Sequence, residues 1–273
     1  MVSGPGSTRD GSLPPLDVPS SAPFAVPELE PLPDDGPAPP THPRAPLEQG
    51  VRLSDALRKG TRDVHALAEG TPFADDLLSG RVSVTGYADL LAQYHAVYGT
   101  LEWCAQEISA DTDGASVVFP ELHRLEALEN DLTALAGPGW SSRFAVREIT
   151  GVYAQRVAEV GVSVGGYVAH AYTRYLGDLS GGQVIRSVLQ RQHNLDDDAV
   201  AYLSFPAITR IKPFKDLYRA RIDALPLSPA VQAAVVAEAR VAFELNTELL
   251  RELGREYCEE RGRRSGRHLM HPS

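Results

Sequence analysis

Three glycines and one carboxylate stand close together in the segment 172–183, which reads Tyr-Thr-Arg-Tyr-Leu-Gly-Asp-Leu-Ser-Gly-Gly-Gln. Apolar residues recur at helical spacing on both sides, so the simplest interpretation is one long helix with glycines in its middle. Gly177 and Gly181 are four residues apart and would share a face of that helix. A face without Cβ atoms would let something flat and bulky approach the backbone. Asp178 would then place a hydrogen-bonding carboxylate beside a large apolar ligand.

Two other interpretations of this segment can be compared with the first. An interior glycine costs a helix about 1 kcal/mol relative to alanine, so the glycines could instead mark a kink or a break between two helices. A loop that cradles phosphate is excluded on residue grounds. No Lys-Ser or Lys-Thr pair follows the glycines, and Asp178 would put a negative charge where the phosphate would sit.

His65 is the histidine whose neighbours best suit a metal ligand. The helical pattern places it on the apolar face of the first helix, where an unpaired imidazole is costly. Glu69 follows four residues later, within reach of the ring nitrogen that a metal would not use. Cations that could pair with the carboxylates of a ligand precede it within two turns: Arg58, Lys59 and Arg62.

A lone histidine on an apolar face is more often a satisfied core residue than a ligand. Here the accompanying charges and the glycine segment favour a ligand to a metal macrocycle. His170 precedes the first of these glycines by seven residues, so it is a rival candidate for iron or for a structural contact.

Helices must position these residues, because almost every segment from Leu53 onward has helical periodicity and no stretch alternates like a strand. The fold class predicted is all-α, a single compact domain of seven or more helices. The expected helices are one that starts with Ser54 as N-cap and ends before Gly70, then 85–108, a leucine-rich helix over 122–135 ended by 137–139, 146–157 with a break at Gly161, 164–192, 214–224, and a long helix opened by Ser228 as N-cap and Pro229.

Composition divides the chain into three parts. Residues 1–50 hold 13 of the 21 prolines and carry two basic against seven acidic side chains, so we expect a disordered extension and not a targeting peptide. The folded domain is expected over 51–258, and 259–273 reads as a polar, disordered tail. Half of the formal net charge of −10 belongs to the extension, and the mildly acidic remainder argues against nucleic acid as a partner.

Membrane spans and disulfide frameworks are not expected. No run of about 18 apolar residues occurs, so nothing should cross a membrane. Cys104 and Cys258 are far apart and match no metal-binding spacing, which fits a reducing cytoplasm.

Two segments together resemble the signature regions of the heme oxygenase family. The first is Leu-Ser-Asp-Ala-Leu at 53–57, continued by Thr61, His65 and Glu69, and the second is 172–183. The glycine-containing segment is highly specific, and the order and spacing of the two agree. Further resemblance lies in 94–98, in 214–219, in Ala242-Phe243 and in Leu245-Asn246. The resemblance covers about 51–257 and implies an all-α fold that holds heme between a proximal helix and a kinked distal helix.

The resemblance also implies a role for each matching residue. His65 matches the ligand of the heme iron, oriented by Glu69, and Asp178 matches a carboxylate that anchors a water network able to deliver protons to dioxygen. The other matches are Gly177, Gly181 and Gly182 against the heme face, Arg174 and Tyr98 in the polar network, Arg58, Lys215 and Arg219 with Tyr172 at the propionates, Phe243 as a pocket wall and Asn246 as its polar neighbour. Arg58 departs from the lysine that animal members commonly carry, which leaves the charge but alters the propionate geometry.

The activity implied is that of an oxidoreductase, the cleavage of heme, usually at the α position, to biliverdin, ferrous iron and carbon monoxide. Dioxygen and electrons from a ferredoxin, flavodoxin or similar reductase would be needed, as in a soluble, bacterial-type enzyme. Two other functions stay open: heme storage, transport or sensing on the same scaffold, and an iron-free helical enzyme. Asp178 and the glycines favour catalysis over storage, and the cations Arg58, Lys215 and Arg219 would lack an acidic ligand in the iron-free case.

Overall fold

Four long helices frame the fold, and shorter ones cover their ends. The computed structural model describes residues 50–258, and within that range the regular structure is entirely helical, as predicted. The helices are α1 Leu53–Gly60, α2 Arg62–Glu69, α3 Pro72–Leu78, α4 Val84–Ile108, α5 Thr112–Val117, α6 Leu125–Ala136, α7 Trp140–Arg143, α8 Glu148–Gly161, α9 Val164–His193, α10 Ile211–Asp223 and α11 Pro229–Tyr257, with 3-10 turns η1 Pro120–Leu122, η2 Asp197–Ala199 and η3 Ala201–Leu203.

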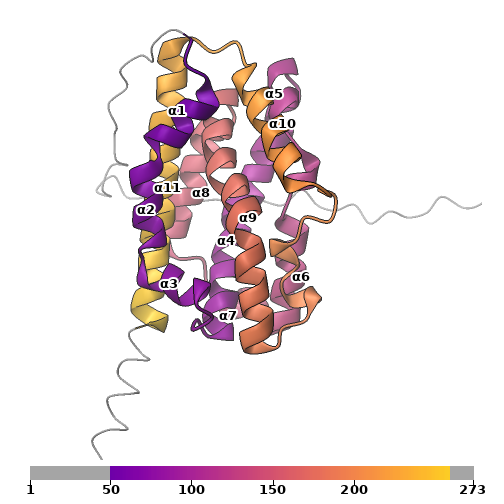
Figure 1. The fold of residues 1–273 in the computed structure, drawn as a ribbon. Helices are drawn as coiled ribbons and strands as arrows, with labels where there is room; N and C mark the ends of the chain where they lie inside the picture. Colours follow the sequence, from indigo (N-terminus) through magenta and orange to yellow (C-terminus); the bar gives the residue numbers. More distant parts are fainter. Residues whose placement is uncertain (1–49, 259–273) are drawn as a thin grey trace, which may run out of the picture.

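The long helices α4, α8, α9 and α11 run along the molecule beside one another (Figure 1). α11 packs on both α9 and α8, and α4 packs on α6 and α8. Their facing stripes of apolar residues form one core, in which Tyr98, Leu101, Val168 and Leu249 are completely or almost completely buried. Burial of such side chains is worth about 1.5–3 kcal/mol each, which is what keeps these helices together.

α9 is a single uninterrupted helix of 30 residues, so the alternative of a break at the glycines is wrong. The hydroxyl of Ser163 caps its start by accepting a hydrogen bond from the backbone nitrogen of Gly166 at 3.2 Å. Asn194 ends it in the left-handed conformation with φ of 53°. Nearly all residues from Tyr167 to Leu176 are buried, whereas burial becomes sparse beyond Leu179. The glycine segment therefore lies where the helix emerges from the core.

The first predicted helix is two helices, and its predicted cap is wrong. α1 already begins at Leu53, and Ser54 instead uses its backbone nitrogen and its hydroxyl to bind the carboxylate of Asp223, each at 2.8 Å. This pair ties α1 to the end of α10. Gly60 ends α1, and a Cβ there would lie 2.5 Å from Cγ1 of the Val236 side chain on α11, so the chain turns where only a glycine leaves room for that side chain.

The other predictions concern the cap of α11, the number of helices, membrane spans and the two ends of the chain. Ser228 does cap α11, because its hydroxyl accepts a hydrogen bond from the nitrogen of Val231 at 3.3 Å. The sequence analysis missed the short helices α3, α5 and α7. No described helix combines the length and the apolar character needed to cross a lipid bilayer. The predictions for the N-terminal extension up to residue 49 and for the tail 259–273 fall outside the described residues.

Candidate functional site

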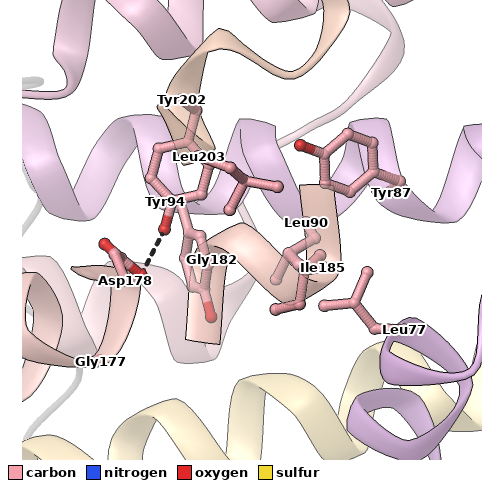
Figure 2. Close-up of a pocket in the computed structure, with 10 residues that line it drawn as sticks. All are labelled: Leu77, Tyr87, Leu90, Tyr94, Gly177, Asp178, Gly182, Ile185, Tyr202 and Leu203. Atoms are coloured by element: carbon pink, nitrogen blue, oxygen red, sulfur yellow. Dashed lines mark hydrogen bonds between the residues drawn. The ribbon is translucent and has the colours of Figure 1, made fainter. Parts of the chain in front are cut away.

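Asp178 on α9 is the centre of a buried polar network. Its Oδ1 accepts a hydrogen bond from the hydroxyl of Tyr202 in η3 at 2.8 Å, and its Oδ2 accepts one from Tyr98 of α4 (Figure 2 shows the first). Arg174 lies one helical turn earlier, with Nη2 3.5 Å from Oδ1. Burial raises the pKa of Asp178, while Arg174 and the two hydroxyls oppose that rise. The net effect is a raised pKa, so Asp178 holds a proton more readily than an exposed aspartate does.

Arg174 is buried, and its guanidinium group forms hydrogen bonds, an ion pair and a cation–π contact with its neighbours. Its Nη1 donates to Oδ1 of Asn246 on α11 at 2.7 Å, and the hydroxyl of Tyr94 donates to the same oxygen at 3.1 Å. The guanidinium carbon also lies 4.0 Å from the centre of the Tyr94 ring, within cation–π range. Three of the predicted site residues, Tyr98, Arg174 and Asn246, thus meet around Asp178.

The three glycines of the α9 segment differ in how much open space lies beside them. A Cβ built on Gly177 or Gly181 would meet no described atom within 4 Å, so that strip of helix backbone is open to a ligand. Gly182 is different, because a Cβ there would lie 3.4 Å from Leu203 of η3. The prediction of one shared ligand face therefore suits Gly177 and Gly181, whereas Gly182 lets η3 pack against α9.

A small cavity adjoins the carboxylate and the glycines (Figure 2). It is lined by Leu77, Tyr87, Leu90, Tyr94, Gly177, Asp178, Gly182, Ile185, Tyr202 and Leu203. Its volume of about 70 Å³ exceeds the roughly 10–15 Å³ that one water molecule needs by the same measure, so it can hold water. Polar groups on one wall and aliphatic groups on the other suit a short water chain that starts at Asp178.

His65 lies on α2 in a less buried position than the sequence analysis predicts. Its side chain is 49 % exposed, so the expectation of an imidazole on a covered apolar face is wrong. Nδ1 is 3.4 Å from Oε2 of Glu69, which leaves Nε2 as the nitrogen that a metal could use. The ring packs edge-on against Phe243 of α11, with 5.4 Å between the ring centres.

α11 connects the two halves of the site. Phe243 contacts His65, and Asn246 contacts Arg174. These two residues are three positions apart on one helix, so they project from the same face. The imidazole and the carboxylate network are therefore positioned by a common, well-packed helix.

The predicted propionate cations gather where α1, α9 and α10 meet. Lys215 donates from Nζ to the hydroxyl of Ser180 on α9 at 2.8 Å, directly beside Gly181. Burial raises the pKa of Tyr172, and the positive charges of Arg219 and Arg58 oppose that rise. Arg58 and Arg219 also pair with Asp55 and Asp216, at 3.4 and 3.1 Å. These partly exposed cations could bind the acidic groups of a ligand.

His170 serves a structural contact, and its rival candidacy for iron is wrong. It is completely buried between helices, with Nε2 3.1 Å from Oε1 of Glu238 on α11. Arg156 of α8 binds the same carboxylate through two hydrogen bonds of 2.9 and 2.6 Å. Burial alone would raise the pKa of Glu238, but the bonds from His170 and Arg156 outweigh it and lower the pKa to about 2. The cluster joins α8, α9 and α11.

The sequence analysis did not assign a site role to Tyr94 or Tyr202. Tyr94 precedes Tyr98 by one helical turn, and that spacing was a usable signal. Tyr202 lies in a short 3-10 turn with no periodicity, so nothing in its surroundings indicated that it reaches Asp178.

Taken together, the residues suit a flat ligand that carries a metal and acidic groups. The open backbone at Gly177 and Gly181 accommodates a planar surface, His65 offers one nitrogen to a metal, and Lys215 and Arg219 offer positive charge. Asp178 adds a carboxyl that can exchange protons on the glycine side.

Comparison with known proteins gives one consistent family. The family model described as heme oxygenase matches residues 51–252. Heme oxygenase 1 of Rattus norvegicus is 40% identical over 212 residues, covering 76% of this chain and 73% of the rat protein. Heme oxygenase 1 of Synechocystis sp. is 35% identical over 204 residues, covering 74% and 85% of the two chains. The crystal structure of heme oxygenase-1 from Synechocystis in complex with heme superposes with a TM-score of 0.75 at 33% identity, covering 81% of this chain and all of that one.

Proposed function

Because the chain belongs to the heme oxygenase family, we propose that it cleaves heme oxidatively to biliverdin, ferrous iron and carbon monoxide with dioxygen and electrons from a donor protein. The observation that carries this activity is the buried carboxyl of Asp178. It is held by Tyr98, Tyr202 and Arg174 beside the open backbone of Gly177. A protein that only stores heme has no need of a proton-exchanging group there.

The described residues provide a place for each part of heme. Nε2 of His65 would bind the iron, and the backbone at Gly177 and Gly181 would lie against the ring. The propionates would pair with Lys215, Arg219 and Arg58, assisted by the hydroxyl of Tyr172. When bound, heme supplies the iron at which dioxygen is reduced, and it is also the molecule that is oxidised.

The protein's own contribution is the control of protons and water. Asp178 has a raised pKa, so it can take up a proton and return it closer to neutral pH than an exposed aspartate could. Tyr98 and Tyr202 fix the direction of its two oxygens, and the adjoining cavity has room for waters that would extend its reach. Arg174 stabilises the negative form of the carboxyl and keeps the network fixed between α4, α9 and α11.

Electrons would come from a small redox protein such as a ferredoxin or flavodoxin. The exposed cations of α10 border the propionate cluster, and they would attract an acidic donor to the edge of the heme. Both cysteines of the chain are free thiols, which supports a cytoplasmic location.

The test is to add hemin and then an electron source in air, and to follow the visible spectrum. We expect a Soret band that decays while the absorption of biliverdin grows. His65→Ala should abolish this turnover, whereas Leu67→Ala, which changes an exposed residue of the same helix, should not. A hemin complex that keeps its Soret band under reduction would mean storage or transport instead. Failure to bind hemin at all would contradict the proposed function.

A further inference from the structure

Two tyrosines each donate a hydrogen bond to one oxygen of the Asp178 carboxylate, and they come from very different elements. Tyr98 lies within the long helix α4, whereas Tyr202 lies in the three-residue turn η3. Tyr202 is only 2 % exposed, and its hydroxyl donates to Oδ1 at 2.8 Å. A side chain on so short a turn can keep this geometry only if the turn itself is held.

Asp131 of α6 holds the turn through its backbone nitrogens. It is completely buried, and its two oxygens accept hydrogen bonds from Ala201 at 2.7 Å and from Tyr202 at 2.9 Å. The carboxylate therefore fixes the backbone of Tyr202 itself.

Arg124, at the start of the same helix, holds the turn from its carbonyl side. Its guanidinium donates to the carbonyl oxygen of Tyr202 at 3.5 Å and to that of Ser204. It also covers the ring of Phe205, with 4.1 Å between the guanidinium carbon and the ring centre.

Burying polar and charged groups costs free energy, and here the carboxyl group of Asp131, whose pKa burial raises to about 7, and the guanidinium group of Arg124 are both directed at one short turn. The apolar neighbour Leu203 packs η3 against α9, since a Cβ built on Gly182 would lie 3.4 Å from its side chain. The contacts of Asp131 and Arg124 with the turn fix the direction of the Tyr202 hydroxyl. That direction points at the carboxylate of the proposed site (Figure 2).

We propose that Tyr202 is a positioning residue for Asp178, and that Asp131 and Arg124 act on the reaction by holding Tyr202 in place. The effect of Tyr202 on heme cleavage rests on the proposed function, whereas its effect on the pKa of Asp178 does not. A hydroxyl that donates to a carboxylate favours the ionised form. Tyr202 therefore opposes the effect of burial and sets how readily Asp178 takes up a proton.

The direct test needs no heme. In the full-length, heme-free protein the carboxyl carbon of Asp178 is titrated by NMR, with Asp178→Asn to assign the signal. Tyr202→Phe removes only the hydroxyl, so we expect the pKa of Asp178 to rise. Tyr87→Phe is the matched control, because Tyr87 lines the same cavity and its hydroxyl has no hydrogen-bond partner among the described residues. An unchanged titration in Tyr202→Phe would overturn the proposal.

The support from Asp131 is tested by a double-mutant cycle. Asp131→Asn should raise the pKa of Asp178 in the wild-type background and change it little when Phe already occupies position 202. Equal effects in both backgrounds would contradict a route through Tyr202. If Asp131→Asn does not fold, Arg124→Lys takes its place in the cycle, because it keeps the charge but loses the two-carbonyl contact.

For heme cleavage, we expect the dependence of the rate on pH to shift. Tyr202→Phe should bind hemin as the wild type does, and its rate profile should shift to higher pH, in the same direction as the NMR titration. A purely structural role would lower the rate at every pH without moving the profile. If the protein binds hemin but does not cleave it, the proposed function fails while the heme-free titration still decides the role of Tyr202.

Discussion

At the level of single residues, opposing influences meet in Asp178. Burial favours its neutral form, and Arg174 and two tyrosine hydroxyls favour its ionised form. Burial is the stronger influence, so the pKa of Asp178 is raised, which suits a group that takes up and returns a proton in general acid–base catalysis.

Asp178→Asn is therefore the most informative change at the site. The amide keeps the size of the side chain but can neither carry the charge nor exchange a proton. We expect hemin to bind as before and the yield of biliverdin to fall about 100-fold or more, the typical contribution of a general acid–base residue. The bound hemin should instead support peroxidase-type oxidation of an added phenol. The measurements are biliverdin absorption and phenol oxidation, and ordinary biliverdin yield from this variant would refute the role given to the carboxyl.

Residue-level prediction from sequence works best where partners lie on one helix. Arg174 and Asp178 are one turn apart on α9, so their pairing is implicit in the spacing. Tyr98 was assigned only through the family resemblance, because it reaches Asp178 from α4. Tyr202 and Asp131 were missed for a physical reason. Their link passes through backbone nitrogens of a 3-10 turn, and such contacts impose no pattern on side-chain types.

At the level of helices, α9 combines two opposed demands. Its first half is covered on most sides and needs packing, whereas the glycine segment needs an uncovered backbone. Glycine in the helix interior sacrifices about 1 kcal/mol relative to alanine, so the open strip is maintained against helix propensity.

Gly177→Ala should therefore separate stability from ligand binding. The new methyl group would meet no described atom within 4 Å, so we expect the heme-free protein to gain about 1 kcal/mol. Its thermal midpoint should rise by about 2–4 °C for a domain of this size. Hemin should bind more weakly, because the methyl group would lie between the helix and the ring. Thermal unfolding and hemin titration measure the two effects.

Gly151→Ala on α8 is the control for that experiment. Its added Cβ would also meet nothing within 4 Å, so it should bring a similar gain in stability without any loss of hemin affinity. Equal hemin affinity for the Gly177 and Gly151 variants would contradict the assignment of the glycine strip to the ring.

Helix-level prediction succeeded where apolar periodicity ran for many turns, as in α4 and α11, and failed at the ends of short elements. The break between α1 and α2 lies at Gly60, where a Cβ would meet the side chain of Val236 at 2.5 Å. Ser54 has the composition of an N-cap, but the carboxylate of Asp223, brought near by the fold, is a stronger partner. Both outcomes depend on neighbours far away in the sequence, which local propensity cannot include.

At the level of the whole molecule, charge is distributed unevenly. The chain carries a formal net charge of −10, yet α10 carries four basic against two acidic residues. Lys212 is almost fully exposed, at 89 %, and forms an ion pair with Asp216 at 3.0 Å. Leu217 on the same helix is 46 % exposed, so an apolar side chain lies among these charges. An acidic protein that approaches an otherwise acidic surface would be steered to this region.

Lys212→Glu should therefore slow electron delivery by an acidic ferredoxin-type donor without affecting heme. At low ionic strength we expect the rate of heme cleavage to fall several-fold, and the difference from the wild type should disappear near 1 M salt, where the screening length is only about 3 Å. Ascorbate, a small reductant that needs no docking, should drive both proteins equally. Arg251→Glu makes the same charge change on the C-terminal part of α11, whose end lies across the molecule from α10, and should leave the rate nearly unchanged (Figure 1). Equal slowing by both variants would point to net charge alone and would contradict docking at α10.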